Sequence, residues 1–130
     1  MRVSLIITTY NRADALLLVL RSIELQTLMP NEVIIADDGS GDDTKAIINA
    51  FQKTSDLNII HSWQKDNGFR VAKSRNKAVA KSNNEYIILI DGDMILHPEF
   101  VQDHLNNAEP GYFIQGTRVL LTENETSNAL

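Results

Sequence analysis

The stretch "YIILIDGDMILHPEF", residues 86–100, joins a buried-strand pattern directly to two carboxylates. Five residues that favour a strand lead into Asp91-Gly92-Asp93. Asp and Gly are common in turns, so the motif is compatible with a plain surface turn. The other interpretation is a site for a hard metal ion, and the rest of the sequence has to distinguish the two.

Upstream of this stretch, the same kind of strand pattern alternates with helical patterns. A nearly continuous apolar run at residues 3–8 predicts a strand buried on both faces, and the stretches at residues 32–37 and 57–63 predict two more strands. Between the runs, apolar residues recur at helical spacing, as in Leu16, Val19, Leu20 and Ile23. Asn11 is expected to cap the first helix, and Asp42 or Asp43 the second.

The part of the chain after the aspartates predicts one more helix and one more strand. Pro98 suits the first turn of a helix whose residues Phe100, Val101 and Leu105 face inward. Residues 111–121, "GYFIQGTRVLL", have a β-rich composition and are expected to form a last strand. The polar tail at residues 122–130 is expected to fray.

This alternation predicts a single α/β domain over residues 1–130, with a mostly parallel Rossmann-like sheet and helices on both faces. Ligands of such sheets bind beyond the carboxyl ends of the strands. The first strand ends at Thr8, Thr9 and Tyr10, and the second at Asp37 and Asp38. With Asp91 and Asp93 after the fourth strand, these side chains are expected to gather at one edge.

The residue types at this edge indicate the chemistry of a bound nucleotide. Asp91 and Asp93 repel each other unless a cation lies beside them, and magnesium or manganese prefers such oxygen ligands. Asp38 could accept a hydrogen bond from a base, and the ring of Tyr10 could stack on one. Arg70 suits phosphate recognition.

Other conspicuous residues have ordinary structural explanations. The aromatic residues Trp63 and Phe69 are assigned to packing. His97 follows Asp93 by four residues, but a lone histidine is more often structural than a metal ligand.

Composition excludes several classes of protein. The 130 residues carry a net charge of -5, which disfavours general nucleic-acid binding, and no cysteine is present for disulfides or a thiolate zinc site. No apolar run approaches the length of a membrane span, and the first apolar run is too short for a signal peptide. A cytoplasmic location is therefore expected, with peripheral membrane association left open.

Four motifs in order resemble the nucleotide-binding part of family 2 glycosyltransferases, which have the GT-A fold. They are "SLIITTYNRADALLLVLRSIELQT", "NEVIIADDGSGDDT", "DNGFRVAKSRNKAVAKSNNE" and the stretch ending in the D-x-D motif, and together they span nearly the whole chain. The resemblance implies inverting transfer of a sugar from a nucleotide-diphosphate donor, UDP being favoured, to a glycan or lipid-linked acceptor.

The resemblance also implies residue roles. Thr8 and Tyr10 line the nucleoside pocket, Asp38 reads the base, and Arg70 lies near the base or phosphates. Asp91 contacts the ribose, and Asp93 ligates Mn²⁺ or Mg²⁺.

The catalytic base of the family lies well beyond the D-x-D motif. Glu123 and Glu125 in the tail match no such base, so the chain is expected to be truncated before its acceptor-binding part.

Other interpretations remain open from the sequence. A haloacid-dehalogenase-type phosphatase also has a strand followed by D-x-D, although no downstream lysine and acidic pair follow here. A receiver domain would need an acidic pair after the first strand, where threonines stand. A non-catalytic nucleotide-sugar-binding module is the main alternative to an enzyme, because no catalytic base can be placed.

Overall fold

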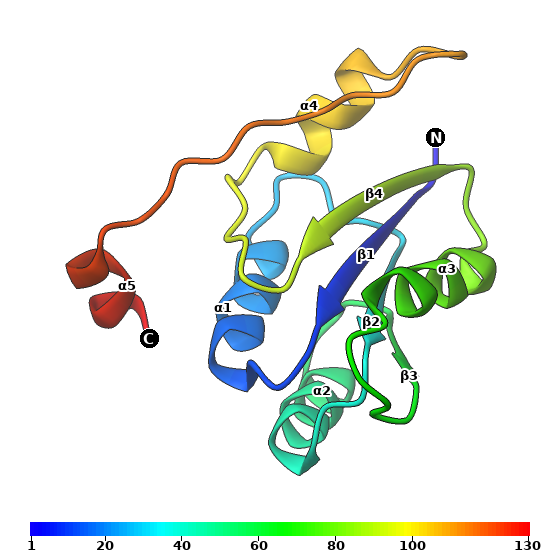
Figure 1. Ribbon diagram of the computed structural model, residues 1–130. Helices are drawn as coiled ribbons and strands as arrows, with labels where there is room; N and C mark the ends of the chain where they lie inside the picture. Colours follow the sequence, from blue (N-terminus) through cyan, green and yellow to red (C-terminus); the bar gives the residue numbers. More distant parts are fainter.

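The computed structural model describes residues 1–130, which form four strands and five helices (Figure 1). The elements in chain order are β1 (Val3–Thr9), α1 (Ala13–Glu24), β2 (Glu32–Asp37), α2 (Asp42–Thr54), β3 (Ile59–Trp63), α3 (Val71–Lys81), β4 (Tyr86–Asp91), α4 (Phe100–Asn107) and α5 (Glu123–Ala129). The strands and helices expected up to residue 107 are all present, with ends that differ by a few residues.

The four strands form one parallel sheet in the order β3-β2-β1-β4. The chain builds outward from β1 through β2 to β3 and then crosses to the other side of β1 to form β4. The register pairs Thr8 with Asp91 and Thr9 with Asp37. The carboxyl ends of three strands therefore meet at one edge, beside the point where the strand order reverses, which is where open α/β sheets bind ligands.

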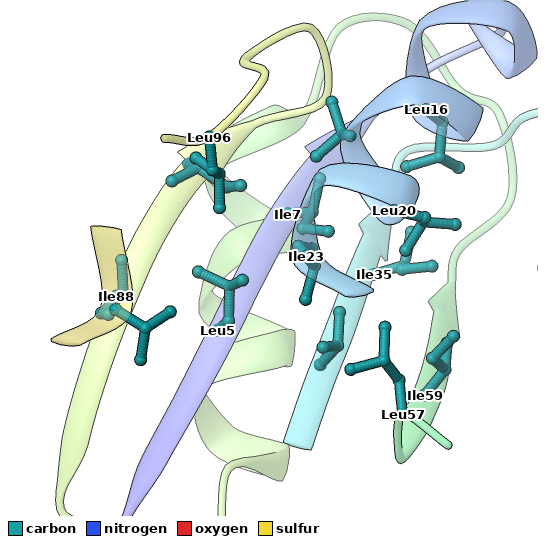
Figure 2. Packing of buried hydrophobic residues seen from close by; sticks show 14 of the residues in the cluster. Leu5, Ile7, Leu16, Leu20, Ile23, Ile35, Leu57, Ile59, Ile88 and Leu96 are labelled. Atoms are coloured by element: carbon teal, nitrogen blue, oxygen red, sulfur yellow. The ribbon is translucent and has the colours of Figure 1, made fainter. Parts of the chain in front are cut away.

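Helices cover both faces of the sheet, as the sequence predicts (Figure 1). On one face, α1, α2 and α4 pack over alternate residues of the strands, including Leu5, Ile7 and Ile35 (Figure 2). This face contains the main core of sixteen buried residues. Full burial of each such side chain contributes about 1.5–3 kcal/mol, so this face dominates the stability of the domain.

The opposite face is covered by α3 alone. Ile6, Ile34 and Ala36 point to this side and pack with Ala78 of α3. The cover does not extend over β4, where Ile87 and Leu89 remain 37% and 51% exposed. β4 is an edge strand by the strand order, and its face on this side of the sheet is open to solvent.

The expected last strand at residues 111–121 is absent. These residues run as an extended, exposed segment between α4 and α5, with no neighbouring strand (Figure 1). A β-rich composition yields a strand only where a partner supplies the ladder of hydrogen bonds, and no partner lies here. The expectation of a strand was wrong for that reason.

The polar tail, which is expected from the sequence to fray, contains the short helix α5. Thr122 Oγ1 accepts from Glu125 N (3.1 Å) and donates to Glu125 Oε1 (2.9 Å), so the Thr122 side chain caps the N-terminus of α5. The pattern T-x-x-E in the sequence is the signal for this helix. All residues of α5 are exposed.

The expected helix caps also differ. Arg12 and Gly41 occupy the N-cap positions of α1 and α2, and neither helix has a side-chain cap. Asn11 instead accepts a hydrogen bond from Gly41 N (2.9 Å), so its side chain joins two loops. Pro98 lies two residues before α4 rather than in its first turn.

Candidate functional site

A cavity of about 230 Å³ opens at the carboxyl edge of the sheet. Its lining comes from the ends of β1, β2 and β4 and from the start of α3: Thr8, Thr9, Tyr10, Arg12, Asp38, Phe69, Val71, Asp91, Gly92 and Asp93. Five of the six site residues expected from the sequence line this cavity, the exception being Arg70. The structure thus brings together side chains that lie up to 85 positions apart.

The motif Asp91-Gly92-Asp93 is held against the end of β1. Thr8 Oγ1 donates a hydrogen bond to Asp91 Oδ1 (3.0 Å). Gly92 is buried, and a Cβ on it would lie 2.6 Å from the carbonyl oxygen of Thr8. The glycine between the two carboxylates is thus required by close approach to the neighbouring strand. It is not among the residues with positive φ, so backbone freedom is not the reason.

The residues at this edge suit a divalent cation that is shared with a substrate. Asp91 and Asp93 line the same cavity, and no group of three or more acidic or histidine side chains is assembled there. Magnesium and similar ions often use one or two carboxylates and take further ligands from substrate phosphates. Thr9, which also lines this cavity, has a buried Oγ1 without a hydrogen-bond partner.

Asp38 is nearly buried, at 4% exposed, and closes a loop formed by residues 65–69. Its Oδ1 accepts from Gln64 Nε2 and its Oδ2 from Arg70 N, both at 2.7 Å. The carboxylate therefore ties the two ends of this loop together. Because each carboxylate oxygen has two lone pairs, Asp38 can still accept a hydrogen bond from a ligand.

The same loop also contacts the end of β1. Tyr10 Oη donates to Asp66 Oδ2 (2.7 Å), and this hydrogen bond and the charge of Asp66 raise the pKa of Tyr10. Gly39 has a φ of 103°, and a Cβ on it would lie 2.5 Å from the Cα of Asp66. Only glycine at position 39 lets the loop of residues 65–69 lie so close to the end of β2.

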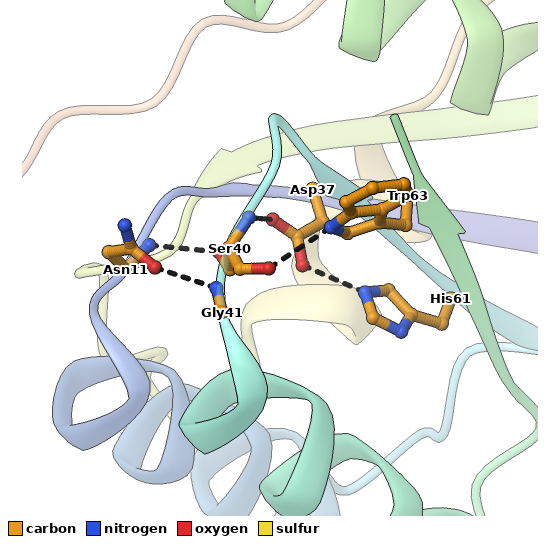
Figure 3. A network of polar contacts seen from close by, with 6 residues as sticks. All are labelled: Asn11, Asp37, Ser40, Gly41, His61 and Trp63. Atoms are coloured by element: carbon orange, nitrogen blue, oxygen red, sulfur yellow. Dashed lines mark hydrogen bonds and ion pairs between the residues drawn. The ribbon is translucent and has the colours of Figure 1, made fainter. Parts of the chain in front are cut away.

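A network of polar contacts supports the loop after β2 from both sides (Figure 3). Asp37 accepts from Ser40 N (2.9 Å) and from His61 Nε2 (2.8 Å). Trp63 Nε1 donates to the carbonyl oxygen of Ser40 (3.1 Å). Asn11 N donates to Ser40 Oγ (2.8 Å), which joins the turn after β1 to the same loop.

Asp37 is fully buried, and the network keeps it ionised. Burial alone would raise its pKa, but the hydrogen bonds from His61 and Ser40 outweigh burial, so the pKa of Asp37 is lowered. The network therefore fixes the backbone that carries the next residue, Asp38.

Arg70 does not line the cavity, although it is expected from the sequence to lie near the base or phosphates. Its guanidinium donates to the carbonyl oxygen of Lys65 (2.8 Å), and its backbone N–H binds Asp38. The arginine in the cavity wall is Arg12, which is not among the site residues expected from the sequence.

Phe69, which is assigned to packing from the sequence, is 90% exposed and lines the cavity. Gly68 before it has a φ of 78°, so the chain turns sharply at this point. Trp63 is also half exposed, and its ring nitrogen serves the network around Ser40. An aromatic residue after a turn-forming "DNG" sequence is the signal that could have identified Phe69.

A second, larger cavity of about 680 Å³ shares Arg12 and Asp93 with the first. Most of its lining is apolar, and part of it comes from residues 117–121 and α5. His97 faces this second cavity and not the first, and its Nδ1 accepts from Glu99 N (3.2 Å).

No helix in the chain has the length and hydropathy needed to cross a membrane.

Comparisons with known proteins identify relatives of this chain. The profile for glycosyl transferase family 2 matches residues 4–129. The chain is 36% identical over 103 residues to the chondroitin synthase of Escherichia coli and to the hyaluronan synthase of Pasteurella multocida. These matches cover 78% of this chain but only 15% and 10% of the two synthases. The uncharacterized glycosyltransferase YwdF of Bacillus subtilis is 30% identical over 125 residues, which is 45% of its length.

Solved structures show the same fold. TarS of S. aureus in complex with UDP superposes with a TM-score of 0.72 at 28% identity, covering 82% of this chain and 31% of TarS. The mannosyltransferase PcManGT of Pyrobaculum calidifontis, in complex with GDP-Man and Mn²⁺, has a TM-score of 0.63 at 27% identity, covering 71% and 27% of the two chains. The profile match, the relatives and the shared GT-A fold show that this chain belongs to glycosyl transferase family 2.

Proposed function

We propose that this chain forms the donor-binding part of an inverting glycosyltransferase that uses a nucleotide-diphosphate sugar and a divalent metal ion. The observation that carries the proposal is the cavity at the carboxyl edge, where Asp38, Asp91 and Asp93 converge with Thr8 and Tyr10. UDP is the favoured nucleotide, because the structural neighbour TarS was solved with it. Family membership argues against the phosphatase and receiver-domain alternatives.

In this proposal each side chain acts through ordinary contacts. The ring of Tyr10 stacks on the base, and Asp38, fixed by Gln64 and Arg70, accepts from an N–H of the base. Asp91 contacts the ribose, and Thr8 orients its carboxylate. Asp93 would hold a manganese or magnesium ion, which would neutralise charge that develops on the diphosphate leaving group.

The acceptor hydroxyl attacks the anomeric carbon from the face opposite the diphosphate, the bond from that carbon to the diphosphate oxygen breaks, and a carboxylate base takes the hydroxyl proton. The structure does not place that base in the donor cavity. Glu125 is occupied in the cap of α5, and neither Glu123 nor Glu125 lines either cavity. The alternative expected from the sequence is a nucleotide-sugar-binding module without transferase activity of its own. A glycan or lipid-linked molecule is the proposed acceptor class.

Calorimetric titration with UDP, GDP, CDP and TDP, each with and without Mn²⁺, tests the proposal. We expect one nucleotide, UDP, to bind most tightly and to bind more tightly with Mn²⁺ than in chelator. Failure of all four nucleotides to bind would overturn the proposed function. Hydrolysis or transfer assays with UDP-sugars then distinguish the enzyme from the binding module.

A further inference from the structure

Arg12 is the only cationic residue in the wall of the donor cavity, which it shares with three carboxylates, Asp38, Asp91 and Asp93. A nucleoside diphosphate adds further negative charge to this site. A divalent ion beside Asp93 offsets only part of that charge, so the cavity needs another positive group near the phosphates. Arg70 is not in the lining of this cavity, and its guanidinium donates to the carbonyl oxygen of Lys65.

The guanidinium of Arg12 is hydrogen-bonded through its Nε, while its two terminal nitrogens make no hydrogen bond. Its Nε donates to Asp14 Oδ1 (3.1 Å), and no other hydrogen bond of the side chain is present. The backbone N–H of Ala15 and then the guanidinium of Arg12 lower the pKa of Asp14, which keeps this partner ionised. The four N–H groups on the two terminal nitrogens of Arg12 therefore have no acceptor in the protein.

The backbone of Arg12 is fixed by the turn that precedes it. Asn11 has a φ of 47°, in the left-handed region that few residues other than glycine adopt. Its N–H and its side chain bind Ser40 and Gly41, which ties this turn to the loop after β2. The carbonyl oxygen of Arg12 then accepts from Leu16 N (2.9 Å), so Arg12 is the N-cap residue and α1 begins at the next residue.

Arg12 and Asp93 are the two residues that line both cavities, so Arg12 stands in the wall on the side of the cavity where Asp93 lies. On the basis of the proposed function, we propose that Arg12 binds the diphosphate of the donor with its free terminal N–H groups. A planar guanidinium can donate two parallel hydrogen bonds to a phosphate, which an ammonium group cannot reproduce. Arg12 is then a donor-binding residue that stabilises the leaving group.

The ordinary alternative is a surface arginine paired with Asp14. Both side chains are about half exposed, and such pairs contribute little to stability. Arg12→Ala should therefore fold normally, which makes a binding test possible.

Calorimetric titration of the full chain with UDP and with uridine, both in the presence of Mn²⁺, separates the two explanations. Arg12→Ala is expected to weaken UDP binding by about tenfold or more and to leave uridine binding within about twofold of wild type. Arg12→Lys is expected to recover only part of the affinity for UDP. Arg21→Ala, an exposed arginine in the last turn of the same helix, is the matched control and should bind both ligands like wild type.

Two results would overturn this inference alone: equal UDP affinity in wild type and Arg12→Ala, or an equal loss of affinity for UDP and uridine. The second result would mean that Arg12 shapes the pocket and does not contact phosphate. If wild type bound no nucleoside diphosphate, the proposed function would fail first, and the role of Arg12 with it.

Discussion

Gly92→Ala tests whether the close approach of β4 to β1 is needed for the site. The added Cβ would lie 2.6 Å from the carbonyl oxygen of Thr8 and 3.2 Å from the Cβ of Thr9. Relief of the first contact requires a shift of about 0.4 Å to reach 3.0 Å, the shortest separation that real Cβ atoms show. The obstacle is the backbone of a central strand, which cannot rotate away as a side chain would.

The shift has two measurable consequences. Overpacking of this kind costs about 1–3 kcal/mol, and for a domain of this size each kcal/mol lowers Tm by about 4 °C. The shift also moves Asp91 away from Thr8 Oγ1, now at 3.0 Å, and displaces Asp93. We therefore expect a Tm lower by about 4–12 °C and weaker UDP binding in the presence of Mn²⁺.

Thermal melts and calorimetry of Gly92→Ala and of Gly116→Ala provide the assay. A Cβ added at Gly116 would have no neighbouring atom within 4 Å, and this glycine has no positive φ, so alanine there should be neutral. A Gly92→Ala protein with the Tm and UDP affinity of wild type would show that the two strands are not this close. The requirement for glycine in the motif would then need another explanation.

Three further predictions concern Asp38, Asp93 and Asp37. Asp38→Asn places an amide N–H against one of two donors, Gln64 Nε2 or Arg70 N, so the free energy of unfolding from denaturant melts should fall by about 1.5–3 kcal/mol and calorimetry should show weaker UDP binding. Asp56→Asn, on an exposed bend, is the control, and denaturant melts of Asp38→Asn that equal those of wild type would contradict the loop contacts. Asp93→Ala should leave the Tm of the ligand-free protein equal to or slightly above that of wild type, and it should remove the rise in Tm that Mn²⁺ with UDP causes. A ligand-free Asp93→Ala protein with a lower Tm that keeps the full rise would indicate that Asp93 only forms a structural turn. The pKa of Asp37 is lowered in the folded state, so the stabilisation of the fold by ionised Asp37 is complete above the pKa of the unfolded chain, near 3.8, and is lost as pH falls through the folded pKa. The free energy of unfolding of Asp37→Asn, measured between about pH 3 and 6, should therefore fall less as pH is lowered than that of wild type.

The sheet and the gathering of the candidate site residues at one edge could be predicted from the sequence. The strand patterns are local signals, and the shared edge follows from the topology. Helices cover both faces of β1 and β2, so these strands appear as continuous apolar runs such as residues 3–8. The carboxyl ends of parallel strands share an edge, which places Thr8, Asp38 and Asp91 together without further information.

The errors arise where structure depends on a distant partner. Residues 111–121 have the composition of a strand, but no strand lies beside them. Arg70 is absent from the cavity lining, and its guanidinium donates to the carbonyl oxygen of Lys65 within the loop that Asp38, 32 positions earlier in the chain, closes. The need for Gly92 likewise comes from Thr8 on another strand, so a single sequence gives no sign of it.

The central claim is that nucleotide and metal meet at the carboxyl edge of the sheet, and paramagnetic broadening by Mn²⁺ locates the metal directly. Amide signals of the labelled protein are recorded with UDP and a small amount of Mn²⁺, with Mg²⁺ as the diamagnetic reference. We expect the strongest broadening of amide signals at Thr8, Gly92 and Asp93. The weakest broadening is expected at Arg2 and Glu85, which precede the amino ends of β1 and β4 and lie about 20 Å from the carboxyl edge. Broadening that is strongest at any other part of the chain, or that is absent with UDP present, would contradict the claim.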